Sequence, residues 1–320
     1  MSGVSRSPLS ALEALGRRRP DRSDRQRLVG RARPPEHGAL RAGAEGSRGP
    51  RCAPRLWCRR VTERALTVRG VSVRLLSGGD GPALLFLHAA GGAGRWLPFH
   101  EQLARRFTLL FPSHPGHGGS AAADWIDHIS DLAFHYLDLL DELRLERVHL
   151  VGASFGGWIA AEIAVMASHR LKSLVLIDPV GIKVDGWIYP FLFAMELPQL
   201  VATVFHDPMN ALALAPADLG VDTLVELSRE RAALARVAWN PYLYNPLLKR
   251  RLCRITAPTL LCWGEHDRVA PLQCARAWTA EIAGARLEAF AGSGHVPHIE
   301  EPARAAAVVS EFCAGHEEGR

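Results

Sequence analysis

The sequence contains no run of about 18 apolar residues, the length that a membrane-spanning helix requires. Its six cysteines include no C-x-x-C pair, and no repeated spacing of Cys and His suggests a zinc site. The first sixty residues lack the apolar segment of a secretory signal. These absences predict a reduced, cytoplasmic protein that needs neither a metal nor another cofactor.

Lysine is also absent from residues 1–60, which carry 15 Arg against five Asp and Glu, a net charge of +10. The remaining residues, 61–320, have 23 basic against 28 acidic groups, a net charge of −5. The basic character of the chain therefore belongs to its first part and does not indicate a nucleic-acid partner. This part is rich in Arg, Pro, Gly and Ser without an apolar period, which predicts a disordered leader. An Arg-rich, acid-poor start is also found in organellar transit peptides, although the Pro and Gly content fits an amphipathic presequence poorly. Upstream sequence with no role in the fold is the other alternative.

From Ala65 onward, short apolar runs alternate with longer amphipathic ones. Apolar and polar residues alternate over residues 65–76, as in the strands of a β-hairpin. Over residues 125–143 the apolar side chains are spaced by three and four, as in an amphipathic helix. The other expected strands are 83–88, 107–111, 147–151, 171–177, 259–263 and 286–290, and the other expected helices are 155–167, 272–282 and 302–312. Strands that alternate with helices predict an α/β fold with a mostly parallel central sheet flanked by helices.

Residues 181–251 interrupt this alternation with eight aromatic side chains and six prolines. We expect short helices separated by prolines, inserted between two strands of the sheet as a lid. An ordinary peripheral helical layer is the alternative, and either one would cover the ends of the strands. The predicted organisation is a leader (1–60), a first core part (61–180), a helical lid insertion (181–251) and a second core part (252–320).

Gly152, Ser154 and Gly156 form a G-x-S-x-G motif between an expected strand and an expected helix. Small residues let the backbone turn tightly there, with the serine at the tip of the turn. The motif is common by chance, but the strand before it and the helix behind it favour a nucleophilic serine. The helix N-terminus also offers amide donors and a partial positive charge to an oxyanion.

A nucleophilic serine needs a base within hydrogen-bond reach. His295 is the best placed, because its glycine-rich loop, GSGHVPH, follows the last expected strand, and the carboxyl ends of strands are where α/β sheets gather reactive groups. A solvent-exposed loop histidine is the alternative. The neighbouring His298 is a weaker candidate, expected to face the following helix.

The base in turn needs a carboxylate on its Nδ1. Asp267 ends the turn after the strand expected at 259–263, and the chain order serine, aspartate, histidine is the one expected for this kind of sheet. Asp178, after the strand expected at 171–177, is the second candidate acid, and Glu265 is the third. Each of these two is otherwise a plain turn residue.

An oxyanion also needs amide donors. The first candidate is the amide of Phe155, the residue after the nucleophile. The second is Ala90, with Ala89 as its alternative, in the small-residue loop HAAGG that follows the strand expected at 83–88. A tight loop that binds nothing would have the same composition.

These motifs resemble the α/β-hydrolase superfamily over residues 65–314. The matching segments are LLFLHxxGG, PSHPGHGGS, GASFGG, WGEHD and GSGHVPHIEEP. Two departures stand out: Ala89 replaces the usual glycine after the histidine, and Ser113 replaces the usual aspartate before the PGxGxS turn. The first bears on the geometry of the oxyanion loop, and the second removes a structural carboxylate.

The resemblance implies a serine hydrolase acting on a carboxylic ester or a related acyl bond of a small-molecule substrate. A serine at position 154 argues against the epoxide hydrolases and haloalkane dehalogenases of the superfamily, which need a carboxylate nucleophile. Hydrolysis of C–C bonds in ring-cleavage products is the first alternative, and a non-catalytic receptor or an acyltransferase of the same fold is the second. The aromatic, lysine-poor composition of residues 181–251 predicts an apolar substrate with a modest acyl or aromatic portion.

Overall fold

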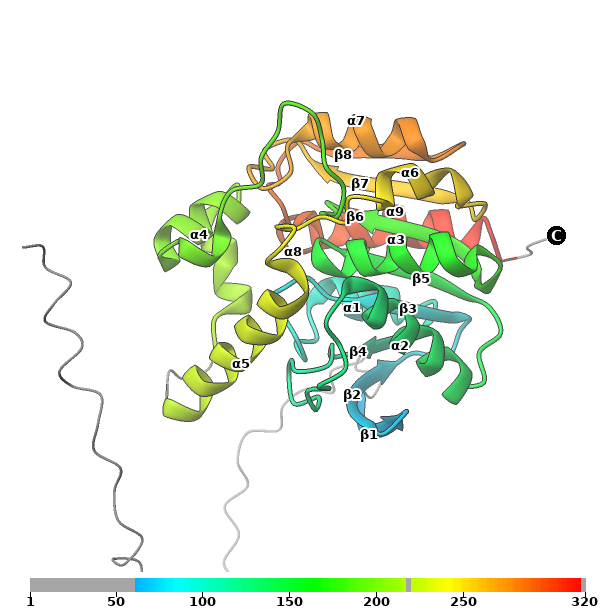
Figure 1. Ribbon diagram of the computed structural model, residues 1–320. Coiled ribbons are helices and arrows are strands. Elements are labelled where there is room, and N and C mark those ends of the chain that lie inside the picture. The colour runs from blue at the N-terminus through cyan, green and yellow to red at the C-terminus, as the bar shows by residue number, and fades with distance from the viewer. Residues whose placement is uncertain (1–60, 217–219, 318–320) are drawn as a thin grey trace, which may run out of the picture. The chain divides into compact units, whose positions relative to one another are not determined.

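A sheet of eight strands lies at the centre of the part of the chain that the computed structural model describes, residues 61–216 and 220–317 (Figure 1). The strand order is β1-β2-β4-β3-β5-β6-β7-β8. The pairs β1–β2 and β2–β4 are antiparallel, and the other pairs are parallel. The bounds are β1 Thr62–Val68, β2 Val71–Gly78, β3 Ala83–Leu87, β4 Thr108–Pro112, β5 Val148–Ala153, β6 Leu171–Ile177, β7 Thr259–Gly264 and β8 Arg286–Phe290. The predicted α/β fold with a mostly parallel sheet is confirmed, while the leader expected at 1–60 lies outside the described residues.

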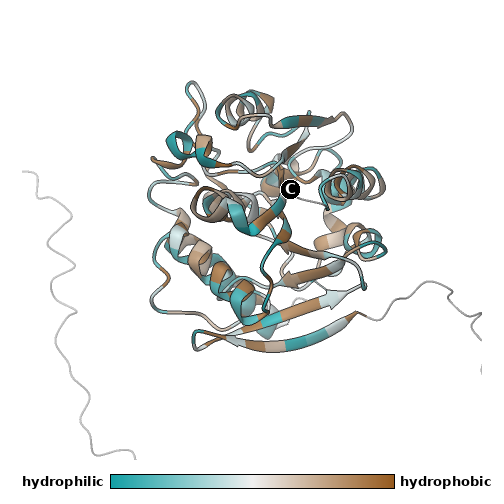
Figure 2. Cartoon of the chain, turned by 90° about the vertical axis from the view of Figure 1, so that its right-hand side faces the viewer, coloured by the Kyte–Doolittle hydropathy of each residue, from teal (hydrophilic) through white to brown (hydrophobic). Residues whose placement is uncertain are grey.

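The inner strands read as continuous apolar runs because helices cover both faces of the sheet. All residues of β5 and β7 are buried. On one face lie α2 (Ile129–Glu142), α3 (Phe155–Ala167) and α7 (Leu272–Glu281), and on the other lie α1 (Pro98–Leu103) and α9 (Pro302–Ala314). In Figure 2, brown and teal residues alternate along several of these helices, as expected for helices that present one apolar side to a sheet.

Helix α3 is the most deeply buried helix on its face, with every residue except Met166 buried. It contains an acidic residue, Glu162, whose Oε1 accepts hydrogen bonds from Trp158 Nε1 (3.2 Å) and from Asn245 Nδ2 (2.8 Å). Burial raises the pKa of the Glu162 carboxyl above its ordinary value. This side chain therefore joins the central helix to the end of the segment between β6 and β7.

The segment between β6 and β7 contains η3 (Leu192–Ala194), α4 (Leu197–Val204), η4 (Pro208–Leu214), α5 (Val221–Ala238), α6 (Leu248–Arg251) and η5 (Leu252–Arg254). Prolines stand in the first turns of α4 and η4, as the prediction of short helices requires. Helix α5 differs from the short helices that we expected, since it is 18 residues long and contains no proline. None of the helices in the described residues is both long and apolar enough for a bilayer crossing.

Two other differences concern helix positions. The helix expected from residue 125 begins at Ile129, because the Asp131 carboxylate accepts from the backbone N–H groups of Asp127 (3.0 Å) and His128 (2.8 Å) and so caps it there. Helices α1 and α8 (Pro297–Glu300) were not predicted, since each is too short to show a helical period.

Candidate active site

Ser154 lies in a sharp turn between the carboxyl end of β5 and the start of α3. Its φ of 50° and ψ of −111° fall outside the regions that most residues adopt. A Cβ on Gly152 would lie 2.3 Å from the carbonyl oxygen of Gly156, and a Cβ on Gly156 would lie 2.2 Å from that of Leu87. The G-x-S-x-G spacing is thus required by a close backbone crossing, which leaves the serine at the tip of the turn.

The imidazole of His295 lies between Ser154 and Asp267. Its Nε2 is 2.7 Å from Ser154 Oγ, and its Nδ1 is 2.8 Å from Asp267 Oδ2. All three side chains are buried, so little water competes for these hydrogen bonds. With the carboxylate accepting at Nδ1, that nitrogen carries the ring proton and the Nε2 lone pair faces the serine hydroxyl.

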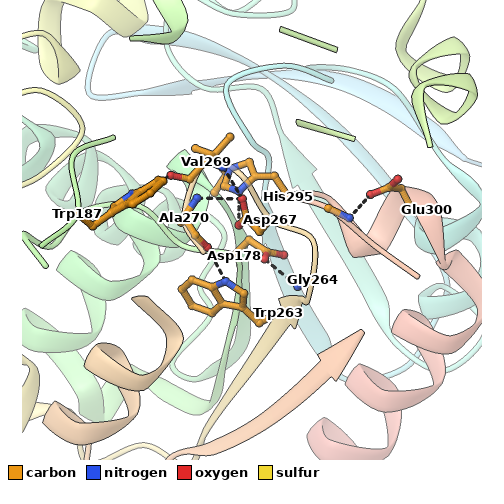
Figure 3. Close-up of polar contacts among 11 residues, drawn as sticks. Asp178, Trp187, Trp263, Gly264, Asp267, Val269, Ala270, His295 and Glu300 are labelled. Carbon is orange, nitrogen blue, oxygen red and sulfur yellow. Dashed lines mark hydrogen bonds and ion pairs between the residues drawn. The ribbon is translucent and has the colours of Figure 1, made fainter. Parts of the chain in front are cut away.

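The Asp267 carboxylate is held from the other side by its own turn (Figure 3). Its Oδ1 accepts from the backbone N–H groups of Val269 (2.7 Å) and Ala270 (2.9 Å). The carbonyls of the same two residues accept from the indole N–H groups of Trp187 (3.1 Å) and Trp263 (2.7 Å). Three hydrogen bonds, including the one with His295, therefore fix the direction of this carboxylate, and the two indole hydrogen bonds hold its turn.

Asp178, the second candidate acid, is fully buried beside Asp267 but makes no hydrogen bond to His295. Its Oδ1 accepts from Gly264 N–H at 3.0 Å, and its Oδ2 has no partner within the described residues. Burial, and next the nearby Asp267 carboxylate, hold the pKa of Asp178 well above its usual range. The hydrogen bond of the His295 imidazole is therefore made with Asp267 and not with Asp178. Glu265, the third candidate acid, is exposed, and the carboxylate that accepts from His295 is that of Asp267.

His298, which we expected to face the following helix, is buried. It packs against the rings of Phe86 in β3 (6.0 Å between centroids) and Phe99 in α1 (5.7 Å). Burial, with a smaller contribution from His295, lowers the pKa of His298 to about 3. It is therefore a neutral ring in the apolar layer between the sheet and α1.

The loop that carries His295 is fastened to the segment between β6 and β7. The His295 N–H donates to the Val204 carbonyl at 2.7 Å. The Glu300 carboxylate accepts from the N–H groups of Gly294 (2.6 Å), His206 (2.8 Å) and Asp207 (3.0 Å). Sequence reasoning missed these contacts, and its only signal was the pair of glutamates that follows the histidine loop in GSGHVPHIEEP.

The candidate oxyanion donors lie on two segments that meet at the turn. Phe155 is the first residue of α3, and Ala90 lies in the loop after β3. A Cβ on Gly156 would also lie 2.5 Å from the His88 carbonyl oxygen, so the start of this loop runs against the turn. The N–H groups of Ala89 and Ala90 donate to no other group in the part of the chain that the structure describes.

A pocket of about 600 Å³ opens beside Phe155, between α5 and the loop that follows β4. Besides Phe155, its apolar lining consists of small or aliphatic residues, including Ala122, Ala123, Ile126, Leu132, Ala233 and Val237. Glu226, Arg229 and Arg236 of α5 contribute its charged part. This volume lies within the range that is typical of small-molecule pockets.

The chain is similar in sequence to a 2-hydroxymuconate semialdehyde hydrolase of Pseudomonas sp. (27% identical, covering 78% of this chain and 93% of the relative). It is also similar to an uncharacterized protein of Mycobacterium bovis (29% identical, covering 77% and 79%). Among solved structures, a bacterial membrane phospholipase A superposes with a TM-score of 0.65 at 25% identity, covering 81% of this chain and 87% of the other. The sequence model of the alpha/beta hydrolase family matches residues 84–308, more than half of the chain. This protein therefore belongs to the alpha/beta hydrolase family.

Proposed function

We propose that this chain is a serine hydrolase that cleaves a carboxylic ester, or a related acyl bond, through an acyl-enzyme. The proposal depends on one observation, the hydrogen-bonded series from Ser154 Oγ through His295 to Asp267, with distances of 2.7 and 2.8 Å. Serine is a weak nucleophile near neutral pH, and an adjacent neutral imidazole is the group that activates it.

In the proposed reaction, Ser154 Oγ attacks the substrate carbonyl carbon while its proton passes to His295 Nε2. The oxyanion of the tetrahedral intermediate accepts hydrogen bonds from the Phe155 and Ala90 amides, and such a donor typically contributes about 10²–10³ to kcat. His295 then gives the proton to the leaving alcohol. A water molecule, activated by the same imidazole, releases the acid and restores the serine.

We propose that the pocket beside Phe155 receives an apolar portion of the substrate. Phe155, whose amide is one of the proposed oxyanion donors, is among the residues that line this pocket. A volume of about 600 Å³ is large enough for an acyl chain or an aromatic group of a substrate. Rates for p-nitrophenyl esters of increasing acyl length test this, and a preference for acetate over all longer or aromatic groups would contradict it.

The second candidate function is hydrolysis of a C–C bond in a ring-cleavage product. It is favoured by the similarity to the 2-hydroxymuconate semialdehyde hydrolase, which extends over 93% of that protein. The same serine, histidine and aspartate would serve both reactions, so the choice depends on the substrate and not on the triad. Parallel assays with esters, lactones and ring-cleavage dienones separate the two.

Labelling by a fluorophosphonate probe tests the nucleophile directly. We expect the full-length protein and a Ser228→Ala control, which removes an exposed hydroxyl of α5, to be labelled, and Ser154→Ala not to be. Labelling without turnover of any ester or dienone would instead favour an acyltransferase or a receptor. Absence of labelling in the wild type would contradict the proposed function.

We also infer that residues 181–251 form a lid between two core parts, 61–180 and 252–320, and that the protein is cytoplasmic. The contacts of Val204, His206 and Asp207 with the His295 loop support a role of the lid segment at the site. The four cysteines among the described residues are all free, which supports a reducing compartment.

A further inference from the structure

We infer that His114 and Tyr136 are positioning residues, which fix the peptide planes of the oxyanion loop through the side chain and carbonyl of His88. This inference rests on the proposed function, since the amides that they orient are those of Ala89 and Ala90. The side chains of both residues make their hydrogen bonds with each other and with His88, not with the serine, the histidine or the aspartate of the proposed triad.

Four hydrogen bonds connect α2 to this loop. The Tyr136 hydroxyl lies 2.5 Å from His114 Nδ1, and His114 Nε2 lies 2.8 Å from the His88 carbonyl. The backbone N–H of His114 donates to His88 Nε2 at 3.0 Å, and His88 Nδ1 lies 2.6 Å from the Ala89 carbonyl. The imidazole rings of His88 and His114 also lie against each other, with centroids 3.7 Å apart and an angle of 32° between their planes.

The hydrogen-bond partners of His88 and His114 determine which ring nitrogen of each carries the proton. His88 Nε2 accepts from a backbone N–H, so the ring proton is on Nδ1 and points at the Ala89 carbonyl. His114 Nε2 faces a carbonyl, which only accepts, so it carries the proton and Nδ1 accepts from the Tyr136 hydroxyl. Tyr136 thus selects the tautomer of His114 that can hold the His88 carbonyl.

The environment keeps all three groups in these neutral forms. Burial lowers the pKa of His88 to about 3 and holds that of His114 well below its usual value, with a further contribution from the neighbouring imidazoles. Burial raises the pKa of the Tyr136 hydroxyl well above its usual value, so it remains a donor.

Two consecutive carbonyls of the loop, those of His88 and Ala89, are therefore each held by an imidazole. In a trans peptide the N–H points away from the C=O of the same plane. The only cis peptide bond in the described residues is Asn240–Pro241, so both loop peptides are trans. Fixing the two carbonyls consequently fixes the directions of the Ala89 and Ala90 N–H groups, which have no partner of their own within the described residues.

The network also lies against the nucleophile turn. The His114 ring is 5.5 Å from the ring of Phe155, the other proposed oxyanion donor. The His88 carbonyl, which accepts from His114, is the group that a Cβ on Gly156 would meet at 2.5 Å. A shift of the His88 carbonyl would therefore change the distance between the loop that carries Ala90 and the turn that carries Phe155.

The test compares Tyr136→Phe, His114→Phe and His114→Gln in the full-length protein. Tyr136→Phe removes only the hydroxyl, and we expect kcat for a p-nitrophenyl ester to fall about tenfold while KM stays within about twofold, because the lost interaction acts on the transition state. A trifluoromethyl ketone, which forms the tetrahedral adduct, should lose affinity by the same factor as kcat/KM. The product carboxylate should bind unchanged. His114→Gln keeps a donor and an acceptor and should retain more kcat than His114→Phe.

His135→Phe is the matched control, because His135 is the neighbouring residue of α2 and is buried without a hydrogen-bond partner within the described residues. We expect it to leave kcat unchanged. ¹⁵N NMR of the imidazoles gives a readout independent of turnover: His114 should be the Nε2–H form in the wild type and a tautomer mixture in Tyr136→Phe. If Tyr136→Phe weakened binding of the ketone and of the carboxylate by the same factor, this inference would be overturned and the proposed function would stand. The same holds if His135→Phe lowered kcat as much as Tyr136→Phe. A wild type that fluorophosphonate does not label would overturn the proposed function, and this inference with it.

Discussion

The side chains of the proposed triad come from loops far apart in the chain, with His295 being 28 residues from Asp267 and 141 from Ser154. Residues that act as one unit lose most of their effect when any member is removed. We expect Ser154→Ala and His295→Ala each to lower kcat by about 10⁴-fold or more, and the double variant to lose little further. Measured kcat values for the three variants with one ester are sufficient, and additive losses would contradict a single unit.

The two neighbouring aspartates should respond differently. We expect Asp267→Asn to lower kcat by roughly 10⁴-fold, because the amide leaves the imidazole in the wrong tautomer. Asp178→Asn should stay within about tenfold of the wild type. The reverse result, with Asp178→Asn inactive and Asp267→Asn active, would make Asp178 the orienting acid.

Asp178 also predicts how stability depends on pH. Its pKa is raised in the folded protein, so the folded state keeps a proton that the unfolded chain releases above about pH 4. The free energy of unfolding contributed by this group therefore falls as the pH rises from about 4 toward the folded pKa. Thermal melts between pH 4.5 and 8 should show a smaller decline of Tm in Asp178→Asn than in the wild type. An exposed substitution, Asp222→Asn, is the control, and parallel curves for all three proteins would refute the assignment.

Among the helices, strands and turns, the sequence predicted those that depend on residues close to one another in the chain. The alternation of apolar runs predicted the central strands, and the G-x-S-x-G spacing predicted the turn of Ser154, because both depend on neighbours within a few residues. Two sets of contacts could not be predicted. One is the hydrogen bonds of Glu300 with His206 and Asp207, and the other is the network from Tyr136 to His88. The first joins residues up to 94 apart in the sequence, and the second joins residues 22 apart (Tyr136 and His114) and 26 apart (His114 and His88), so no local pattern indicates either.

Helix α5 is the element expected to set substrate size, because it forms one wall of the pocket beside Phe155 and Ala122 lies in the opposite wall. Ala122→Phe adds a ring at a position that is exposed in the fold, so it should narrow the pocket without disturbing the core. We expect the preferred acyl chain of p-nitrophenyl esters to shorten, with little change in Tm. Leu224→Phe, on the exposed face of α5 and outside the pocket lining, should leave the profile unchanged. An unaltered profile in Ala122→Phe would place the substrate elsewhere.

At the scale of the whole molecule, charge and core belong to different parts of the chain. Residues 1–60 carry a net charge of +10, whereas residues 61–320 carry −5 and hold the strands and helices of the sheet. In the described residues the first buried apolar side chain is Val68, and β1 before it is largely exposed. The buried apolar side chains that pack against the sheet in the described residues thus begin at Val68.

Deletion of residues 1–60 should consequently leave fold and activity intact. A segment with little apolar periodicity contributes little burial, and burial of apolar surface is the main favourable term in folding. The truncated protein should melt within about two degrees of the full-length one, since a change of about 1 kcal/mol shifts Tm by 2–4 °C in a domain of this size. Its kcat and KM for the same ester should also be unchanged. A Tm lower by about ten degrees would correspond to several kcal/mol and would require the leader to pack on the domain.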